Sequence, residues 1–191
     1  MEVGLTDWEK EIKCFSEKSK NYSEEELINI IKQLTSALSF LQKKNVSHRD
    51  IKPQNIVIFK NNIYKIADFG EAKQIKKLTN NLQTLKGTEI YMSPLLFNGL
   101  RTNQIDIKHN LFKSDVYSLG LSILYAATLN IDNIYEIRKF IDMDDVRKFI
   151  IEVFNGNFSQ KFVDLIERML EINEKFRPDF IELDNIMKKW K

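Results

Sequence analysis

The sequence predicts an α+β fold that is mainly helical, with one short β-hairpin and one helix buried at its centre. Residues 24–44 place apolar side chains at helical spacing, and residues 116–129 are apolar on nearly every side. Two short runs rich in β-branched and aromatic residues, 55–59 and 63–67, flank a turn. A chain of 191 residues fits one domain with a single core.

The first predicted helix follows Ser23. Ser23 and Glu26 have the spacing of a capping box, in which each side chain bonds the other residue's backbone N–H. We expect the helix to end near Lys44 or Asn45. The apolar positions at helical spacing are Leu27, Ile30, Ile31, Leu34, Leu38 and Leu41.

The predicted hairpin joins residues 55–59 to residues 63–67 through Lys60, Asn61 and Asn62, because asparagine favours tight turns. Residues 71–111 show no sustained period and indicate a long ordered loop, a kind of segment that is usually functional in a compact domain.

The second half of the chain is predicted to be mainly helical. Residues 116–129 are typical of a helix buried in the middle of a domain rather than laid on its surface. Further helices are expected at residues 144–154, 161–170 and 179–190, the last of them following Pro178.

Composition excludes several classes of function. The 29 basic and 27 acidic side chains leave a net charge of +2, with no Lys/Arg run to bind nucleic acid or an anionic membrane. The single cysteine, Cys14, cannot form an internal disulfide, and no Cys/His cluster suggests zinc. No segment has the length of a membrane span, and the N-terminus carries acidic residues and no apolar run of a signal peptide, so we expect a cytoplasmic or nuclear protein.

Polar residues gather around the predicted hairpin. The run His-Arg-Asp-Ile-Lys-Pro-Gln-Asn occupies residues 48–55 before it, and Asp-Phe-Gly occupies residues 68–70 after it. This order resembles the catalytic core of eukaryotic protein kinases. The resemblance continues through residues 87–94, 115–120 and 177–178 and covers essentially the whole chain.

The resemblance implies a fold and a chemistry. Residues 1–191 would form the C-terminal, large lobe of a protein kinase domain, from the hinge between the lobes to the last helix. Asp50 would be the base that orients the substrate hydroxyl, and Lys52 would contact the γ-phosphate. Asn55 and Asp68 would hold Mg²⁺. The implied reaction transfers the γ-phosphate of ATP to a protein substrate.

Other positions follow from the same resemblance. Val57 would pack under the adenine of ATP. Lys52, with Gly87 and Thr88 later in the chain, looks like the serine/threonine branch of the family. Thr88 is expected to hydrogen-bond Asp50 and Lys52.

Four residues are expected to support the site rather than react. His48 and Arg49 belong to the catalytic loop, and Asp115 would anchor that loop by hydrogen bonds. Arg177 normally pairs with a glutamate, but the sequence has Leu95 at that position. We therefore expect Arg177 to bond another acceptor, because a buried guanidinium without partners is costly.

The resemblance also implies regulation by phosphorylation. Thr84 precedes Gly87 and Thr88 by the spacing of the family's activating site, with Thr79 as the alternative. Arg49 and Lys73 are expected to pair with its phosphate.

No Gly-x-Gly-x-x-Gly run occurs in the chain, so the small lobe that covers ATP in this family is absent from residues 1–191. We expect the missing lobe, or a partner protein, to cover its docking surface, and the isolated chain to be inactive. The alternative function is a non-catalytic binding or scaffolding module.

Overall fold

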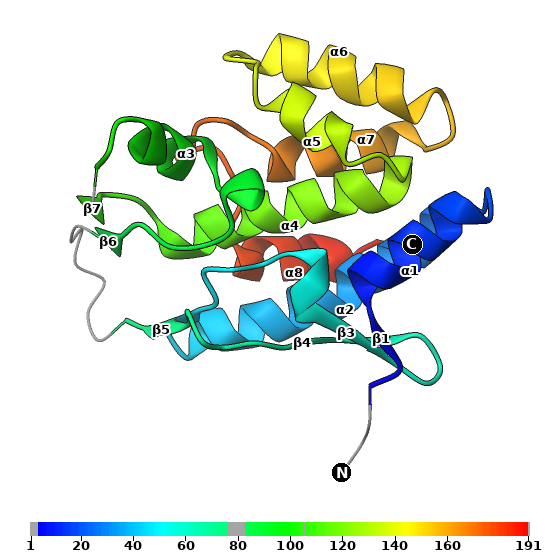
Figure 1. Ribbon diagram of the computed structural model, residues 1–191, viewed down its shortest axis with the longest axis horizontal. Coiled ribbons are helices and arrows are strands. Elements are labelled where there is room, and N and C mark those ends of the chain that lie inside the picture. The colour runs from blue at the N-terminus through cyan, green and yellow to red at the C-terminus, as the bar shows by residue number, and fades with distance from the viewer. Residues whose placement is uncertain (1–3, 76–82, 105, 191) are drawn as a thin grey trace.

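Helix α4 (Leu111–Thr128) runs through the middle of the molecule, with other elements packed on both sides of it (Figure 1). The computed structural model describes residues 4–75, 83–104 and 106–190. Helices α2 (Glu24–Lys43) and α8 (Phe180–Lys188) lie on one side of α4. Helices α5 (Asp132–Ile137), α6 (Met143–Phe154) and α7 (Gln160–Met169) lie on the other. The predicted mainly helical α+β fold is confirmed.

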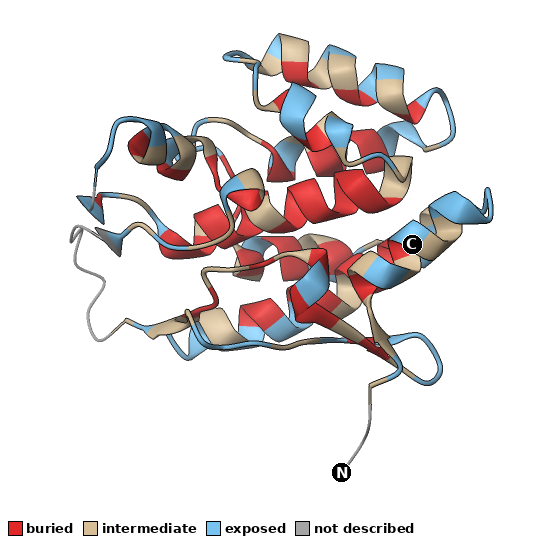
Figure 2. Cartoon of the chain, in the orientation of Figure 1, coloured by how far each residue is buried: buried red, intermediate tan, exposed pale blue. Residues whose placement is uncertain are grey.

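Helix α4 is buried along most of its length, as its sequence predicts (Figure 2). It begins at Leu111 rather than at residue 116, because the Asn110 side chain accepts hydrogen bonds from the backbone N–H groups of Phe112 and Lys113. Gly120 packs directly on α7, since a Cβ at this position would lie 2.9 Å from Leu170 Cδ2. The helix therefore forms the centre of the core.

Helix α2 starts with the predicted capping box. The Ser23 hydroxyl accepts from Glu26 N–H at 3.1 Å, and the Glu26 carboxylate accepts from Ser23 N–H at 2.7 Å. Its apolar face packs against α8 and the hairpin. Helix α1 (Trp8–Glu17) was not predicted, because only Trp8 and Ile12 are buried on it.

The predicted hairpin is formed by β3 (Ile56–Phe59) and β4 (Ile63–Ile66), and β1 (Thr6–Asp7) extends it to a three-stranded antiparallel sheet in the order β1-β3-β4. Asn61 and Asn62 both have φ near +60°, a left-handed conformation that asparagine adopts more readily than most residues. The sheet brings the two polar runs of residues 48–55 and 68–70 to the same end of the molecule.

The segment predicted as one long loop contains regular elements. Strand β5 (Lys73–Gln74) pairs with β2 (Val46–Ser47), and β6 (Gln83–Thr84) pairs with β7 (Asp106–Ile107). The 3-10 turn η2 (Glu89–Tyr91) also lies in this segment, whereas another 3-10 turn, η1 (Pro53–Asn55), lies outside it, directly before β3.

The loop prediction was wrong for α3 (Pro94–Arg101). Pro94 occupies the first turn of this helix, where proline is favoured, and Gly99 lies inside the helix, although both residues contributed to the loop prediction. Gly99 is required by contact, because a Cβ there would overlap the Ile107 side chain. None of the described helices is long and apolar enough to cross a lipid bilayer.

Candidate active site

Asp50 is the centre of a hydrogen-bonded cluster between the loop after β2 and the segment before η2. One carboxylate oxygen accepts from the backbone N–H of Thr88 at 2.9 Å and from its hydroxyl at 2.8 Å. The other lies 2.8 Å from Lys52 Nζ and 3.0 Å from Asn55 Nδ2. Burial raises the pKa of Asp50, but hydrogen bonds from Lys52 and Thr88 outweigh it and hold the pKa below its ordinary value.

Lys52 bridges the two sides of this cluster. Its Nζ donates to the Thr88 hydroxyl at 2.7 Å and contacts Asp50 at the same time. The contacts expected between Thr88, Asp50 and Lys52 are therefore present. The sequence indicated these contacts only through the family resemblance, because Thr88 is far from the loop in the chain.

Gly87 allows Thr88 to reach Asp50. Its φ is +111°, and a Cβ would lie 2.7 Å from the carbonyl oxygen of Arg49. A side chain at this position would force the two segments apart.

Asn55 and Asp68 present oxygen atoms on neighbouring segments. The Asn55 amide nitrogen donates to the Asp50 carbonyl at 2.9 Å as well as to its carboxylate, which leaves the amide oxygen for another ligand. Asp68 is exposed, has φ of +56°, and accepts from Gly70 N–H at 3.2 Å. The two segments are tied together, because Ala67 N–H donates to the Asn55 carbonyl at 2.8 Å.

These two groups fit a magnesium ion. Mg²⁺ prefers oxygen ligands and usually binds proteins through one or two carboxylates, with waters and phosphates completing its shell. An amide oxygen and one exposed carboxylate match that pattern. Within the described part of the chain, no three His, Cys, Asp or Glu side chains are grouped so that they could hold a metal.

Asp115, on α4, holds the loop that carries Asp50. It is only 3% exposed and accepts three hydrogen bonds, from the Ser47 hydroxyl at 2.8 Å and from the backbone N–H groups of His48 and Arg49 at 2.9 Å each. Burial raises the pKa of Asp115, and these donors oppose that rise. The carboxylate thus fixes the backbone directly before Asp50.

His48 joins the same loop to the Asp68 segment. Its Nε2 lies 2.9 Å from the Ala67 carbonyl oxygen, which makes this nitrogen the donor. The ring also packs edge-on against Phe69, with centroids 5.0 Å apart. His48 is fully buried, in the position of a scaffold residue.

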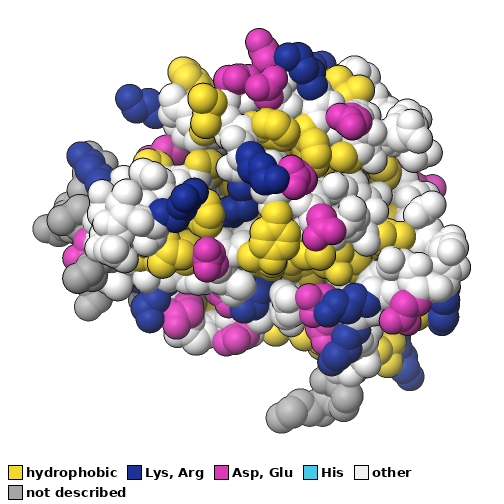
Figure 3. Space-filling view, turned by 45° about the horizontal axis from the view of Figure 1, so that its top comes forward, with side chains coloured by type: hydrophobic (Ala, Val, Ile, Leu, Met, Phe, Trp, Pro, Cys, Tyr) yellow, Lys and Arg dark blue, Asp and Glu magenta, His cyan; other side chains and the backbone are white. Residues whose placement is uncertain are grey.

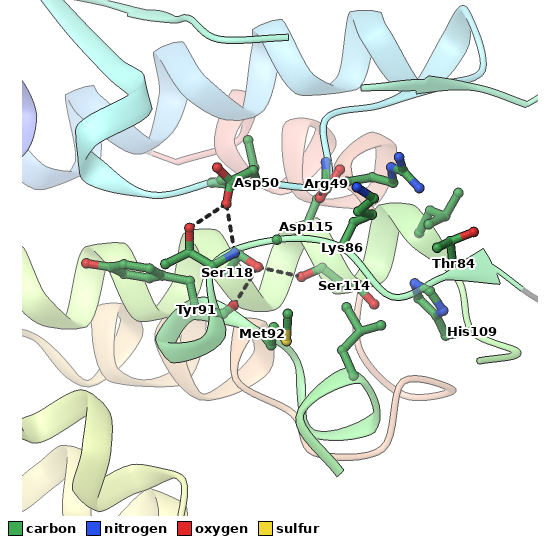
Figure 4. Close-up of a pocket in the computed structure, with 15 residues that line it drawn as sticks. Arg49, Asp50, Thr84, Lys86, Tyr91, Met92, His109, Ser114, Asp115 and Ser118 are labelled. Carbon is green, nitrogen blue, oxygen red and sulfur yellow. Dashed lines mark hydrogen bonds between the residues drawn. The ribbon is translucent and has the colours of Figure 1, made fainter. Parts of the chain in front are cut away.

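A small cavity of about 20 Å³ lies beside Asp50 (Figure 4). Thr84, on β6, is drawn next to His109 at its edge, and Arg49 and Lys86 also line it. Lys73 lies on β5, opposite Ser47 in the two-stranded sheet. Sequence reasoning missed Lys86 and His109, because only the pairing of β6 with β7 brings His109 close to Thr84.

Arg49 and Lys86 share one carboxylate. Arg49 Nε donates to the Glu71 carbonyl at 2.6 Å, and its terminal nitrogen lies 3.8 Å from the Glu71 carboxylate. Lys86 Nζ is 3.3 Å from the same carboxylate. Two cations that line the cavity together with Thr84 therefore share one anion.

Arg177 is buried and bonded entirely to backbone oxygens. It is 1% exposed and donates to the carbonyls of Glu171 at 2.7 Å, Lys113 at 3.0 Å and Ile172 at 3.1 Å. Its guanidinium also lies 4.7 Å from the centre of the Tyr117 ring. These carbonyls are the alternative acceptors that Leu95 makes necessary.

Arg138, which sequence reasoning missed, anchors the segment before α3. One guanidinium nitrogen donates to the carbonyls of Ile90 at 2.9 Å and Met92 at 2.8 Å. The guanidinium also lies 3.9 Å from the centre of the Phe97 ring.

Val57, the residue expected to pack under the adenine, is half-buried on β3. It packs closely against Gly4, where a Cβ would lie 2.3 Å from Val57 Cγ1.

The sequence of residues 5–189 matches the pattern of the protein kinase domain. Mouse serine/threonine-protein kinase Nek9 is 31% identical over 175 residues, and mouse Nek4 is 28% identical over 173 residues, each match covering 87% of this chain. The fission yeast kinase cds1 is 36% identical over 150 residues, or 78% of this chain. The chain spans 16%, 20% and 32% of these three proteins, respectively. With a matching pattern along nearly its whole length, the chain belongs to the protein kinase family.

Proposed function

We propose that this chain is the large lobe of a serine/threonine kinase, which transfers the γ-phosphate of ATP to a protein hydroxyl. The observation that carries the proposal is the closed cluster of Asp50, Lys52, Asn55 and Thr88 beside the exposed carboxylate of Asp68. It supplies a base, a cation and two oxygen ligands within one loop system. These are the groups that phosphate transfer requires.

Each residue has a role in the proposed mechanism. Asp50, held as an ionised carboxylate, orients the substrate hydroxyl and accepts its proton. Lys52 contacts the γ-phosphate from its position beside Asp50. Asn55 and Asp68 would hold Mg²⁺, which neutralises phosphate charge when bound.

The hydrogen bond from Lys52 to Thr88 supports the serine/threonine branch, since a lysine and a threonine at these two positions resemble that branch of the family. The relatives Nek9, Nek4 and cds1 are named as serine/threonine kinases. We therefore propose a serine or threonine hydroxyl as the acceptor.

A further part of the proposal concerns the small lobe. Phe40 and Phe69 are exposed and line a groove of about 570 Å³ beside the Asp68 loop. Exposed apolar surface of this kind indicates a contact with another domain or another protein. We propose that a small lobe, or a partner in its place, covers this surface and completes the ATP site.

The test compares the isolated 191 residues with the same chain joined to the small lobe of a relative. The joined protein is expected to phosphorylate a generic serine/threonine substrate with Mg-ATP, and the isolated chain to remain at background. Ligand at a hundred times its Kd stabilises a fold by about 2.7 kcal/mol. The isolated chain, with half a nucleotide site, is expected to show no thermal shift at millimolar Mg-ATP.

Asp68→Ala in the joined protein is the control, because contaminating kinases would not respond to it. Phosphotyrosine as the main product would contradict the serine/threonine assignment. Robust transfer by the isolated chain that disappears in Asp68→Ala would show that no second lobe is needed.

We also propose Thr84 as the activating phosphorylation site. Thr84 is exposed, and Arg49, Lys86 and His109 line the cavity at its edge. A phosphate there would gain charge-assisted hydrogen bonds from the two permanent cations. Burial lowers the pKa of His109, so its ring is neutral at pH 7 until an anion approaches.

Phosphopeptide mapping of the active joined protein is expected to find phosphate on Thr84. Thr84→Ala should lower activity about tenfold or more, as expected for loss of one to three charge-assisted bonds. The alternative site, Thr79, lies outside the described residues, and Thr79→Ala serves as the comparison. Full activity of Thr84→Ala with loss in Thr79→Ala would reverse the assignment.

A further inference from the structure

Glu71 lies where three segments of the candidate active site meet. It follows the exposed carboxylate of Asp68 by three residues. Its own carboxylate lies 3.8 Å from a terminal nitrogen of Arg49 and 3.3 Å from Lys86 Nζ. Arg49 directly precedes the candidate base, Asp50, and Lys86 belongs to the segment before η2. One side chain therefore connects the loop of a candidate metal ligand, the loop of the candidate base and the segment before η2.

The main chain of Glu71 takes part in the same connection. Arg49 Nε donates to the Glu71 carbonyl at 2.6 Å, so one guanidinium contacts both the backbone and the carboxylate of Glu71. On the other side of Asp68, His48 Nε2 donates to the Ala67 carbonyl at 2.9 Å. The Asp68 loop is thus bonded at both of its ends to two adjacent residues, His48 and Arg49.

Arg49 is the most buried member of this charged group. Its side chain is 13% exposed, whereas those of Glu71 and Lys86 are 40% and 44% exposed. Within residues 4–75, 83–104 and 106–190, Glu71 is the only carboxylate that lies within 4 Å of either cation. A largely buried guanidinium that loses its counter-charge is destabilising. Two positive charges share one negative charge, so one positive charge remains for a second anion.

Thr84 lies beside the same two cations. It lines the cavity of Figure 4 together with Arg49 and Lys86. Glu71 is not among the residues that line this cavity. A phosphate on Thr84 would carry a charge of about −1.5 to −2 at pH 7 and would reach the cations from the cavity. Before that modification, Glu71 supplies the negative charge next to them.

We propose that Glu71 is a positioning residue that takes the place of a phosphate at Arg49 and Lys86 as long as Thr84 is unmodified. It holds the three segments together, and a phosphate on Thr84 then supplies the larger negative charge. This inference rests on the proposed kinase function, because phosphate transfer is the reaction that the three segments would serve. Removal of the Glu71 charge should therefore affect the unmodified chain more than the chain with phosphate on Thr84.

Hydrogen exchange of the 191-residue chain tests this ordering without catalysis. Glu71→Gln keeps the size of the side chain and removes its charge. It is expected to speed amide exchange in peptides covering residues 84–92 about fivefold, as expected for loss of two partly exposed ion pairs. The same substitution with phosphothreonine incorporated at position 84 should exchange as slowly as the parent. The effect of Glu71→Gln should shrink as salt is raised, because pairing of exposed charges is screened.

Side chains of both charge signs are interspersed over the face drawn in Figure 3, so the control must remove a carboxylate elsewhere on the surface. Glu152 is exposed on α6, on the opposite side of α4 from β5 (Figure 1). Glu152→Gln should leave exchange of residues 84–92 unchanged. Equal effects of the two substitutions, or no effect of Glu71→Gln, would overturn the proposal. Fast exchange of Glu71→Gln that persists with phosphate on Thr84 would also overturn it.

The joined protein connects this ordering to the reaction. In its unphosphorylated form, Glu71→Gln is expected to lower kcat about fivefold with little change in the KM for peptide, and with phosphate on Thr84 the variant should match the parent. Equal loss of kcat with and without that phosphate would overturn the role of Glu71 even though phosphate is transferred. If exchange responds to Glu71→Gln in the expected way but the joined protein transfers no phosphate, the kinase function fails and the ordering role of Glu71 stands.

Discussion

Asp50→Asn is expected to lower phosphate transfer by the joined protein about 10²- to 10⁴-fold, the range in which a positioned general base contributes. Asparagine cannot take the substrate proton. It also places an NH₂ group against donors, because Lys52 lies 2.8 Å from one carboxylate oxygen and Thr88 donates twice to the other. The loss should appear mainly in kcat, since Asp50 acts on the hydroxyl in the transition state.

The measurement is steady-state phosphorylation of a serine/threonine peptide with saturating Mg-ATP. Asp144→Asn is a matched control, because Asp144 is an exposed aspartate at the start of α6. Near-parental transfer by Asp50→Asn would remove Asp50 from the role of base. Comparable loss in Asp144→Asn would show that the assay reports general damage.

Asp115→Ala is expected to destabilise the fold by about 3 kcal/mol or more, because it removes a buried acceptor shared by three donors. In a domain of this size such a change lowers the melting temperature by roughly 6–12 °C. The backbone N–H groups of His48 and Arg49 would remain buried and unbonded. The loop that carries Asp50 would lose its anchor on α4.

Thermal unfolding of the isolated chain checks this expectation. Ser47→Ala is the graded control, because it removes one donor to Asp115 and leaves the other two. It should cost about 1 kcal/mol. If the two variants unfold at the same temperature, the three bonds do not act as the loop's main anchor.

The core of the fold was predictable because its signals are local. Ser23 and Glu26 define the start of α2 within four residues, and Asn61 and Asn62 define the hairpin turn in the same way. Helix α4 was predicted because residues 116–129 are apolar on nearly every side. In each case the pattern lies within the element that it predicts.

The elements that were missed have little or no pattern of their own. Helix α1 buries only Trp8 and Ile12, too few positions to define a period. Helix α3 contains Gly99 because Ile107 packs against its backbone, which is a reason that lies outside the helix. Helix α5 is only six residues long. Tertiary packing, and not local propensity, stabilises these segments.

The candidate site shows the same division. The order of the runs 48–55 and 68–70 pointed to Asp50, Lys52, Asn55 and Asp68 through a family resemblance. Arg138 could not be found in this way, because its partners are carbonyl groups, which every residue possesses and no sequence pattern records.

Because these arginines bond to backbone carbonyl groups, the side chains around them can be substituted without loss of the hydrogen bonds. Arg177 and Arg138 together hold five carbonyl oxygens and depend on the course of the main chain rather than on the identity of any side chain. Position 95 is consequently released from electrostatic pairing, and a leucine can occupy it, partly exposed to solvent. Mutations that alter side chains at positions 90 and 92 leave the acceptors in place. The surface around positions 90, 92 and 95 can therefore diversify while its attachment to the core persists.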